Sequence, residues 1–366
     1  MSEHQLSAPP PGTPGAPAAA PGGAGATPAA PAADESARVE REHSRGRRGG
    51  GSVARTLGLV IALAAICVVG YATAGSRFAS VDNLLVILSI ASIIGVLSVG
   101  MTFVITAGGI DLSVGSVLGL ASVWATTVAT QTMANQYGWI VMVACALAVG
   151  VVAGLVNGVL VAYGRVVAFI ATLAMLVAAR GLAEPIAQRR TQLVDVPSFE
   201  DTFKGALLGV PKIVWIFAVV AVAGWFLLNR TTFGRRTVAV GGNPEAARLA
   251  GIAIKRHTMS LYALAGLTAG IAAVMMLART DAGSSTNGLY YELDAIAAVV
   301  VGGTLLSGGR GTIVGTVLGV LIFATLTNLF VQNNLDSSIQ AVARGAIIVG
   351  AVLLQQRFSS RTPRTP

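Results

Sequence analysis

The sequence predicts an all-α, polytopic membrane protein of about ten transmembrane helices, some of them broken or re-entrant, with a short cytoplasmic helix. Of the 366 residues, 54% are hydrophobic and only 11% are charged, whereas soluble domains carry about 25% charged residues. The apolar residues also come in blocks close to the length of about 20 residues that a helix needs to cross a bilayer.

The N-terminal part differs sharply in composition from the rest of the chain. Residues 1–33 are almost entirely Ala, Pro and Gly, with too few apolar side chains to form a core, and a charged, arginine-rich stretch follows up to Arg55. We therefore expect a disordered, basic cytoplasmic tail over 1–55, a transmembrane domain over 56–357 and a cytoplasmic C-terminal tail over 358–366. A cleaved signal peptide would lie nearer the start of the chain, so the first apolar run is expected to be a retained helix.

Ten apolar segments are expected to form the spans. The eighth is too short to cross a bilayer alone, which predicts a broken or re-entrant helix. In chain order the segments are Leu57–Ala74, Leu84–Ile105, Val114–Thr130, Trp139–Val161, Ala168–Ile186, Ile213–Leu228, Met259–Leu277, Ala295–Leu306, Ile313–Val331 and Ile339–Leu354.

Basic residues are concentrated on one side of these spans. If the N-terminus is inside, the residues on the cytoplasmic side include Arg235, Arg236, Lys255 and Arg256, and only a minority such as Arg190 lies outside. This asymmetry predicts a multi-pass protein of the cell membrane with both termini in the cytoplasm. The net charge of +9 flanks apolar spans and forms no basic, aromatic face, so nucleic-acid binding is not expected.

Neither cysteine indicates a metal site. Cys67 and Cys145 both lie within apolar segments and have no neighbour at metal-ligand spacing, and the three histidines are scattered through the tail and one loop. Buried structural thiols are the expected role, and no metal ligand is assigned.

The polar interval Thr231–His257 contains a small helix with its own start and stop signals. Asn243 is a good N-cap, Pro244 suits the first helical position, and Glu245 places an anion near the positive end of the helix dipole. Gly251 can end the helix after about two turns. A capped helix in a basic loop between two spans indicates a surface that is presented to a soluble partner on the cytoplasmic side.

A repeated motif appears at an offset of 200 residues. Each copy is an apolar run, a Gly-Gly break and then Val-Gly-Ser/Thr-Val-Leu-Gly. Repeated halves are common in transporters, whose substrate path lies where the repeats meet; alternatively, two helix pairs use small residues independently for close packing. The matching residues are Val99, Gly108, Gly109, Val114, Gly115, Val117, Leu118 and Gly119 in the first copy, and Val299, Gly308, Gly309, Val314, Gly315, Val317, Leu318 and Gly319 in the second.

Four segments together resemble one family. They are Gly109–Gly115 (GIDLSVG), Gly164–Leu173 (GRVVAFIATL), Gly241–Ile252 (GGNPEAARLAGI) and Tyr291–Gly303 (YELDAIAAVVVGG), and they look like the ribose/xylose-type sugar ABC transporter permeases. The similarity runs from roughly Leu57 to Gln356. The middle of the third segment is similar to the EAA loop that docks on the ATPase, although its Ile-x-Leu-Pro ending is absent, and the Pro/Ala/Gly tail is extra.

The resemblance implies the division of labour of an importer. It implies a second permease copy or paralogue, a two-domain or dimeric cytoplasmic ATPase that binds ATP and Mg, and an extracytoplasmic sugar-binding protein. This chain then needs no cofactor and is not an enzyme; it also contains no Gly-x-x-x-x-Gly-Lys-Ser/Thr motif. The residues expected to couple to the ATPase are Asn243, Pro244, Glu245, Ala246, Ala247, Arg248 and Gly251.

Several polar residues could serve the substrate path. Asp111, beside Ser113, either caps the helix that follows or lines the path. Asn157 and Asn328 could meet sugar hydroxyls, although bonding between helices is the commoner use. Glu292 and Asp294 could face the outer mouth or the binding protein, or they could be solvated loop acids.

An ion-coupled secondary transporter of a small polar solute is the alternative function. Such a protein would be expected to carry acids or histidines in the middle of its spans. Asp111, Glu184 and Asp294 instead fall near predicted span boundaries, and the spans contain no nucleophile with a base that would indicate an enzyme. The sequence does not identify the sugar: ribose, xylose, galactose and inositol-like cargo remain open.

Overall fold

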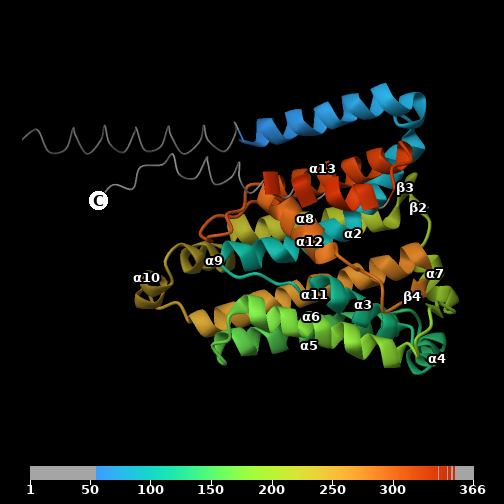
Figure 1. Cartoon of the computed structure of the whole chain (residues 1–366). Helices are drawn as coiled ribbons and strands as arrows, with labels where there is room; N and C mark the ends of the chain where they lie inside the picture. The colour runs from blue at the N-terminus through green and yellow to red at the C-terminus, as the bar shows by residue number, and fades with distance from the viewer. Residues whose placement is uncertain (1–54, 337, 344, 348, 351–366) are drawn as a thin grey trace, which may run out of the picture. The chain divides into compact units, whose positions relative to one another are not determined.

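The computed structural model describes residues 55–336, 338–343, 345–347 and 349–350, which form a helical bundle (Figure 1). The predicted tails, 1–55 and 358–366, and the end of the tenth expected span lie almost entirely outside the described residues. The helices up to Gln332 are Arg55–Arg77, whose last turn is the 3-10 helix η1 (Gly75–Arg77), α2 (Val81–Thr106), α3 (Val114–Ala125), α4 (Val128–Tyr137), α5 (Ile140–Ala162), α6 (Ala168–Ile186), α7 (Pro197–Phe203), α8 (Lys212–Arg230), α9 (Thr232–Gly242), α10 (Pro244–Leu249), α11 (Ile254–Thr280), α12 (Tyr291–Val301) and α13 (Ile313–Gln332).

Among the described residues, seven helices are long and apolar enough to cross a membrane. They confirm the prediction of an all-α, polytopic membrane protein. The seven are Arg55–Arg77, α2, α5, α6, α8, α11 and α13.

Two of the expected spans are short helices in the structure. The segment Val114–Thr130 was expected to be continuous, and this is wrong: α3 ends at Ala125, and Thr127 starts α4 by accepting a hydrogen bond from the Thr130 amide. The eighth segment, α12, has only 11 residues, as its expected break predicts.

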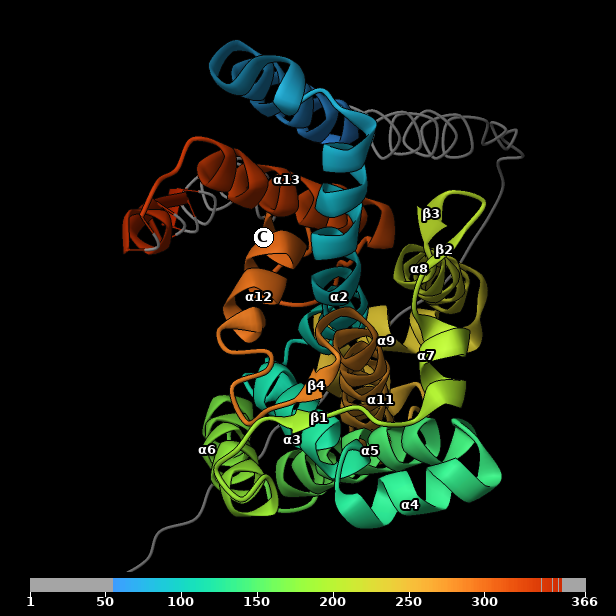
Figure 2. The same ribbon diagram turned by 90° about the vertical axis from the view of Figure 1, so that its right-hand side faces the viewer.

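The connections gather at two opposite ends of the bundle (Figures 1 and 2). One end carries α9 and α10. The other carries α4, α7 and two small antiparallel pairs: β1 (Gln192–Leu193) with β4 (Ala282–Gly283), and β2 (Ala206–Leu207) with β3 (Val210–Pro211). The loops that the sequence placed on opposite sides of the membrane therefore lie at opposite ends of the bundle.

The core forms around α2, α3 and α11, which are mostly buried, whereas Arg55–Arg77, α6 and α8 are largely exposed. Helix α5 packs closely along α11 because glycines face each other. A Cβ on either Gly150 or Gly266 would overlap the carbonyl oxygen of the other residue. Such small-residue contacts are the usual means by which helices approach closely in membranes.

Candidate functional site

The two copies of the repeated motif meet at their glycine breaks. The backbone N–H of Gly309 donates to the carbonyl oxygen of Thr106, the last residue of α2, at 2.8 Å. A Cβ on Gly308 would lie 3.0 Å from the Cα of Gly108. Gly108, Gly308 and Gly309 all have positive φ, at 84°, 81° and 79°, which glycine adopts without steric cost. The breaks after α2 and after α12 therefore form one junction.

Helix α9 ends against this junction. A Cβ on Gly241 would overlap the Thr106 carbonyl oxygen and would lie 2.6 Å from the Gly309 nitrogen. Helix α9 ends at Gly242, and the next residue, Asn243, already caps α10. Only Asn243 therefore lies between the end of α9, which contacts the junction, and the first residue of α10.

Helix α10 has the form that its sequence predicts. The Asn243 side-chain oxygen accepts from the Ala246 amide at 3.0 Å, and Pro244 occupies the first helical position. At the other end, Gly251 has a φ of 81°; its N–H donates to Arg248, and the N–H of the next residue donates to Ala247. These two bonds make a Schellman stop.

The surface of α10 is solvent-exposed except at Ala247. Glu245 and Arg248 form an exposed ion pair, and the hydrogen bond from Arg248 lowers the pKa of Glu245. Leu249 has 76% of its surface exposed although it is a large apolar residue. Helix α10 therefore leaves an apolar side chain exposed at its C-terminal end.

Three of the four predicted path residues lie together where α3 begins. The Asp111 carboxylate accepts from the Ser113 amide at 2.9 Å and from the Ser113 hydroxyl at 2.6 Å. Asn157, on α5, donates to the same hydroxyl at 2.9 Å, and the Tyr262 hydroxyl donates to the Ile110 carbonyl at 3.2 Å. Asp111 and Asn157 are buried. Asp111 therefore orders the turn before α3, whose N-cap is Ser113, instead of capping the helix directly.

Asn328 lies elsewhere and bonds two helices together. Its amide nitrogen donates to Asn83 on α2 at 2.8 Å, and the Asn83 nitrogen donates back at 3.1 Å. Gln332 also donates to Asn83, at 2.9 Å. This arrangement is the interhelical alternative considered for Asn328.

The acids of α12 are buried. Glu292 and Asp294 lie in its first turn with 6% and 8% of their surfaces exposed, so the alternative of solvated loop acids is wrong. The reason is tertiary: α12 packs against α3, where Gly115 leaves room for a Glu292 carboxylate oxygen. That oxygen has no hydrogen-bond partner.

Arg180 is a site residue that the sequence analysis missed. It lies on α6 and donates to the carbonyl oxygens of Ser285 and Asn287, the latter at 3.0 Å. Glu184, one turn further along α6, accepts from the Ser285 hydroxyl at 2.6 Å. The charges of Glu184 and Glu292 both act on the Arg180 guanidinium. The sequence did contain a signal for this residue, since Arg180 lies inside the predicted span Ala168–Ile186. A charge inside a membrane helix costs free energy and usually marks a functional site.

These groups follow one face of α3. Spacings of three and four residues place side chains on the same side of a helix, and α3 with its flanking residues carries a row of small or polar residues at that spacing. The row joins the Asp111 cluster at one end to Thr126 at the other, where the Thr126 hydroxyl donates to the Gln192 side chain at 2.9 Å. Its members are Gly115, Gly119, Ser122 and Thr126.

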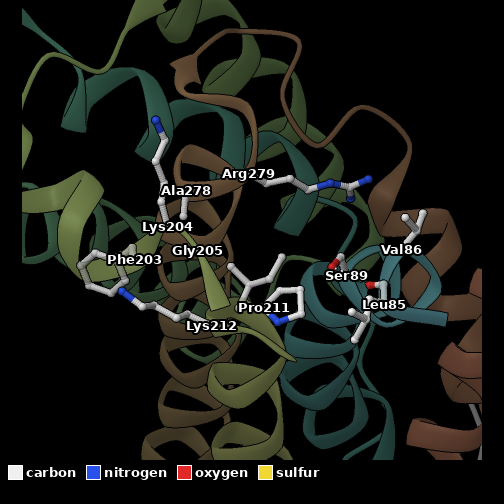
Figure 3. A pocket seen from close by; sticks show the side chains of 11 residues that line it. Leu85, Val86, Ser89, Phe203, Lys204, Gly205, Pro211, Lys212, Ala278 and Arg279 are labelled. Atoms are coloured by element: carbon white, nitrogen blue, oxygen red, sulfur yellow. Dashed lines mark hydrogen bonds between the residues drawn. The ribbon is translucent and has the colours of Figure 1, made fainter. Parts of the chain in front are cut away.

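A separate cavity of about 310 Å³ lies at the end of the bundle opposite α10 (Figure 3). Three cations line it. Lys204 pairs with Glu200 at 3.2 Å and with Asp281 at 2.8 Å, which raises the pKa of Lys204. The Lys212 ammonium donates to a backbone carbonyl at 2.7 Å, and Figure 3 shows Arg279 extending away from both lysines. The cavity is basic and does not include the polar face of α3.

The helices and the buried polar face define a multi-pass membrane transport protein. Residues 83–354 match the family described as the branched-chain amino acid transport system / permease component, and the chain belongs to this family. Its members are permease components, which are transport subunits and not enzymes.

The chain is also similar to individual permeases. It is 40% identical over 305 residues to the ribose import permease protein RbsC of Escherichia coli (strain K12), covering 82% of this chain and 92% of that protein. RbsC of Bacillus subtilis (strain 168) is 39% identical over 76% of this chain and 86% of its own length. The L-arabinose ABC transporter permease protein AraH of Azospirillum brasilense is 37% identical over 76% and 81%. No solved structure matches the chain.

Proposed function

We propose that this chain is the membrane permease subunit of an ATP-binding-cassette importer that moves a pentose, or a similar monosaccharide, into the cytoplasm. The observation that supports this most strongly is the combination of the ribose and arabinose permease relatives with a buried polar face on α3. The ion-coupled alternative finds no support in those relatives.

The polar face of α3 is the proposed sugar path. A sugar needs hydrogen-bond donors and acceptors to replace the water that it loses, since an unsatisfied buried hydroxyl is costly. The Asp111 carboxylate and the unpartnered side-chain oxygen of Asn157 are acceptors at one end of this face. Arg180 and Glu184 supply a donor and an acceptor further along it.

Helix α10 is the proposed contact for the ATPase. Its exposed Leu249 and its Glu245–Arg248 pair offer an apolar and a charged contact. The ATPase binds the ATP and Mg, so this chain carries no cofactor of its own. A movement of α10 is transmitted to the start of α3 through Gly241, because the Gly241 backbone lies against Thr106 and Gly309.

The remaining partners follow from the orientation. We place α10 and both termini in the cytoplasm, so that the opposite end, with α7 and the basic cavity, meets the extracytoplasmic sugar-binding protein. A second permease copy or paralogue completes the membrane part.

Uptake by the full importer in proteoliposomes tests this proposal. With the importer's ATPase and sugar-binding protein present, we expect ATP-dependent uptake of at least one of radiolabelled ribose, xylose and arabinose. We expect Asp111→Asn to lower uptake at least tenfold, because the amide keeps the shape but loses the charged acceptor. Uptake that needs an ion gradient and not ATP would support the secondary-transporter alternative and overturn the proposal.

A further inference from the structure

The loop between β4 and α12 lies directly on the polar face of α3. The Asn287 side chain donates to the Ser122 hydroxyl at 3.1 Å, and a Cβ on Gly119 would lie 2.8 Å from the Asn287 carbonyl oxygen. A Cβ on Gly115 would lie 2.5 Å from the Gly288 carbonyl oxygen. The loop backbone can therefore occupy this position only because α3 carries glycines where the two meet.

The side chains that hold this loop include both hydrogen-bond donors and hydrogen-bond acceptors. Arg180 donates to two oxygens, Ser285 O and Asn287 O. Glu184 accepts from a hydroxyl, and Ser122 accepts from an amide N–H. Cationic donors that meet oxygens, and a carboxylate that meets an O–H group, are also the contacts that a polyhydroxylated sugar makes.

One further group points to a ligand. The Glu292 carboxylate oxygen beside Gly115 is buried and has no hydrogen-bond partner, and it lies one helical turn along α3 from Gly119. An unmade hydrogen bond on a buried carboxylate is costly. A sugar hydroxyl beside Gly115 would supply the missing donor.

We propose that Arg180, Glu184 and Ser122 form an outer sugar-binding subsite, extended by Glu292, which the Ser284–Tyr290 loop occupies in this closed conformation. When the loop leaves, the hydroxyls of an incoming monosaccharide take over its hydrogen bonds. This inference rests on the proposed function, since it places the subsite on the same sugar path.

Two features of the loop favour its release from α3. Its outer residues, Thr286, Leu289 and Tyr290, are exposed, so they give up little buried surface when the loop moves. Tyr290 has a φ of 67° and precedes α12 without a side-chain cap. A non-glycine residue with positive φ stores conformational energy that a second loop conformation can release.

The test compares variants of the subsite with a variant of the loop in the full importer, with radiolabelled ribose as the probe. Arg180→Gln and Glu184→Gln remove subsite contacts, and each should lower uptake about tenfold or more, since bonds to charged groups are the strong ones. Ser285→Ala removes the loop hydroxyl that competes for Glu184, and it should leave uptake unchanged or raise it. Arg190→Gln, which changes an exposed arginine four residues beyond the end of α6, is the matched control.

The direction of the Ser285→Ala effect separates a sugar subsite from a purely structural latch. If Ser285→Ala lowers uptake as much as Arg180→Gln does, the residues only hold the loop and the inference is overturned. Unchanged uptake by Arg180→Gln at normal membrane levels also overturns it. Wild-type importer that takes up none of ribose, xylose and arabinose would instead count against the proposed function itself.

A second measurement does not depend on the Arg180 variant folding. In a background without Cys67 and Cys145, Asn287→Cys is treated with a membrane-impermeant maleimide. Addition of ribose-loaded binding protein should raise the labelling rate several-fold, because the loop leaves α3. An unchanged rate in an importer that transports ribose would contradict the inference.

Discussion

Gly309 donates its backbone N–H to the carbonyl oxygen of Thr106, so the break after α12 is bonded to the end of α2. Gly241, at the end of α9, touches both partners of this bond. The proposed docking helix α10 follows directly. A short backbone connection therefore leads from the loop that carries α10 to the start of α3, where Asp111 lies.

The first prediction concerns this connection. We expect Gly241→Val to separate ATP hydrolysis from transport, because its side chain would overlap the Thr106 carbonyl. Basal ATPase activity should remain, while uptake driven by the loaded binding protein falls at least tenfold. Gly242→Ala is the matched control, since its Cβ would lie 3.8 Å from the Gly309 Cα, an ordinary contact. Equal effects of the two changes would refute the connection.

A second prediction concerns the stop of α10. Gly251 has open space around it but a φ of 81°, so only backbone strain opposes a side chain there. Gly251→Val should weaken co-purification of the ATPase, whereas Gly251→Asn should retain it, because Asn tolerates positive φ far better than a β-branched residue. Asn243→Ala should remove about 1 kcal/mol of helix stability by loss of the cap. Full ATPase binding by Gly251→Val would show that the shape of this stop is not needed.

The orientation of the bundle can be tested with single cysteines. Leu249 in α10 and Leu208 at the opposite end are 76% and 85% exposed, so either position should react readily. In a background without native cysteines, Leu208→Cys should be labelled by an impermeant reagent in intact cells, and Leu249→Cys only after the membrane is opened. Labelling of both from the same side would contradict the proposed orientation.

Asn328 should matter for stability and not for transport. Asn328→Ala removes its reciprocal bonds with Asn83, and bonds between membrane helices contribute about 1 kcal/mol. We expect a lower melting temperature of the purified permease with an unchanged KM for sugar uptake. Asn229→Ala, which loses only a bond within its own helix, is the control. A raised KM with unchanged stability would return Asn328 to the substrate path.

The local features of the fold were predictable from the sequence, and those that depend on packing were not. Helix α10 was predicted in full because Asn243, Pro244 and Gly251 act within one or two turns. The break of α3 was missed because the hydroxyl of Thr127 competes with an otherwise apolar helical pattern. The burial of Glu292 depends on Gly115, which is distant in sequence, so no local pattern could reveal it. Arg180 carried a readable signal, since a mid-span arginine requires partners.

The ion pair between Lys204 and Asp281 links two segments at the end of the bundle opposite α10. Lys204 directly follows α7, and Asp281 directly precedes β4, which leads into the Ser284–Tyr290 loop. A protein that presses on α7 would therefore also displace Asp281, the residue immediately before β4. Under the proposed function, docking of the sugar-loaded binding protein on α7 and movement of the Ser284–Tyr290 loop are one event, and free sugar alone leaves the loop closed.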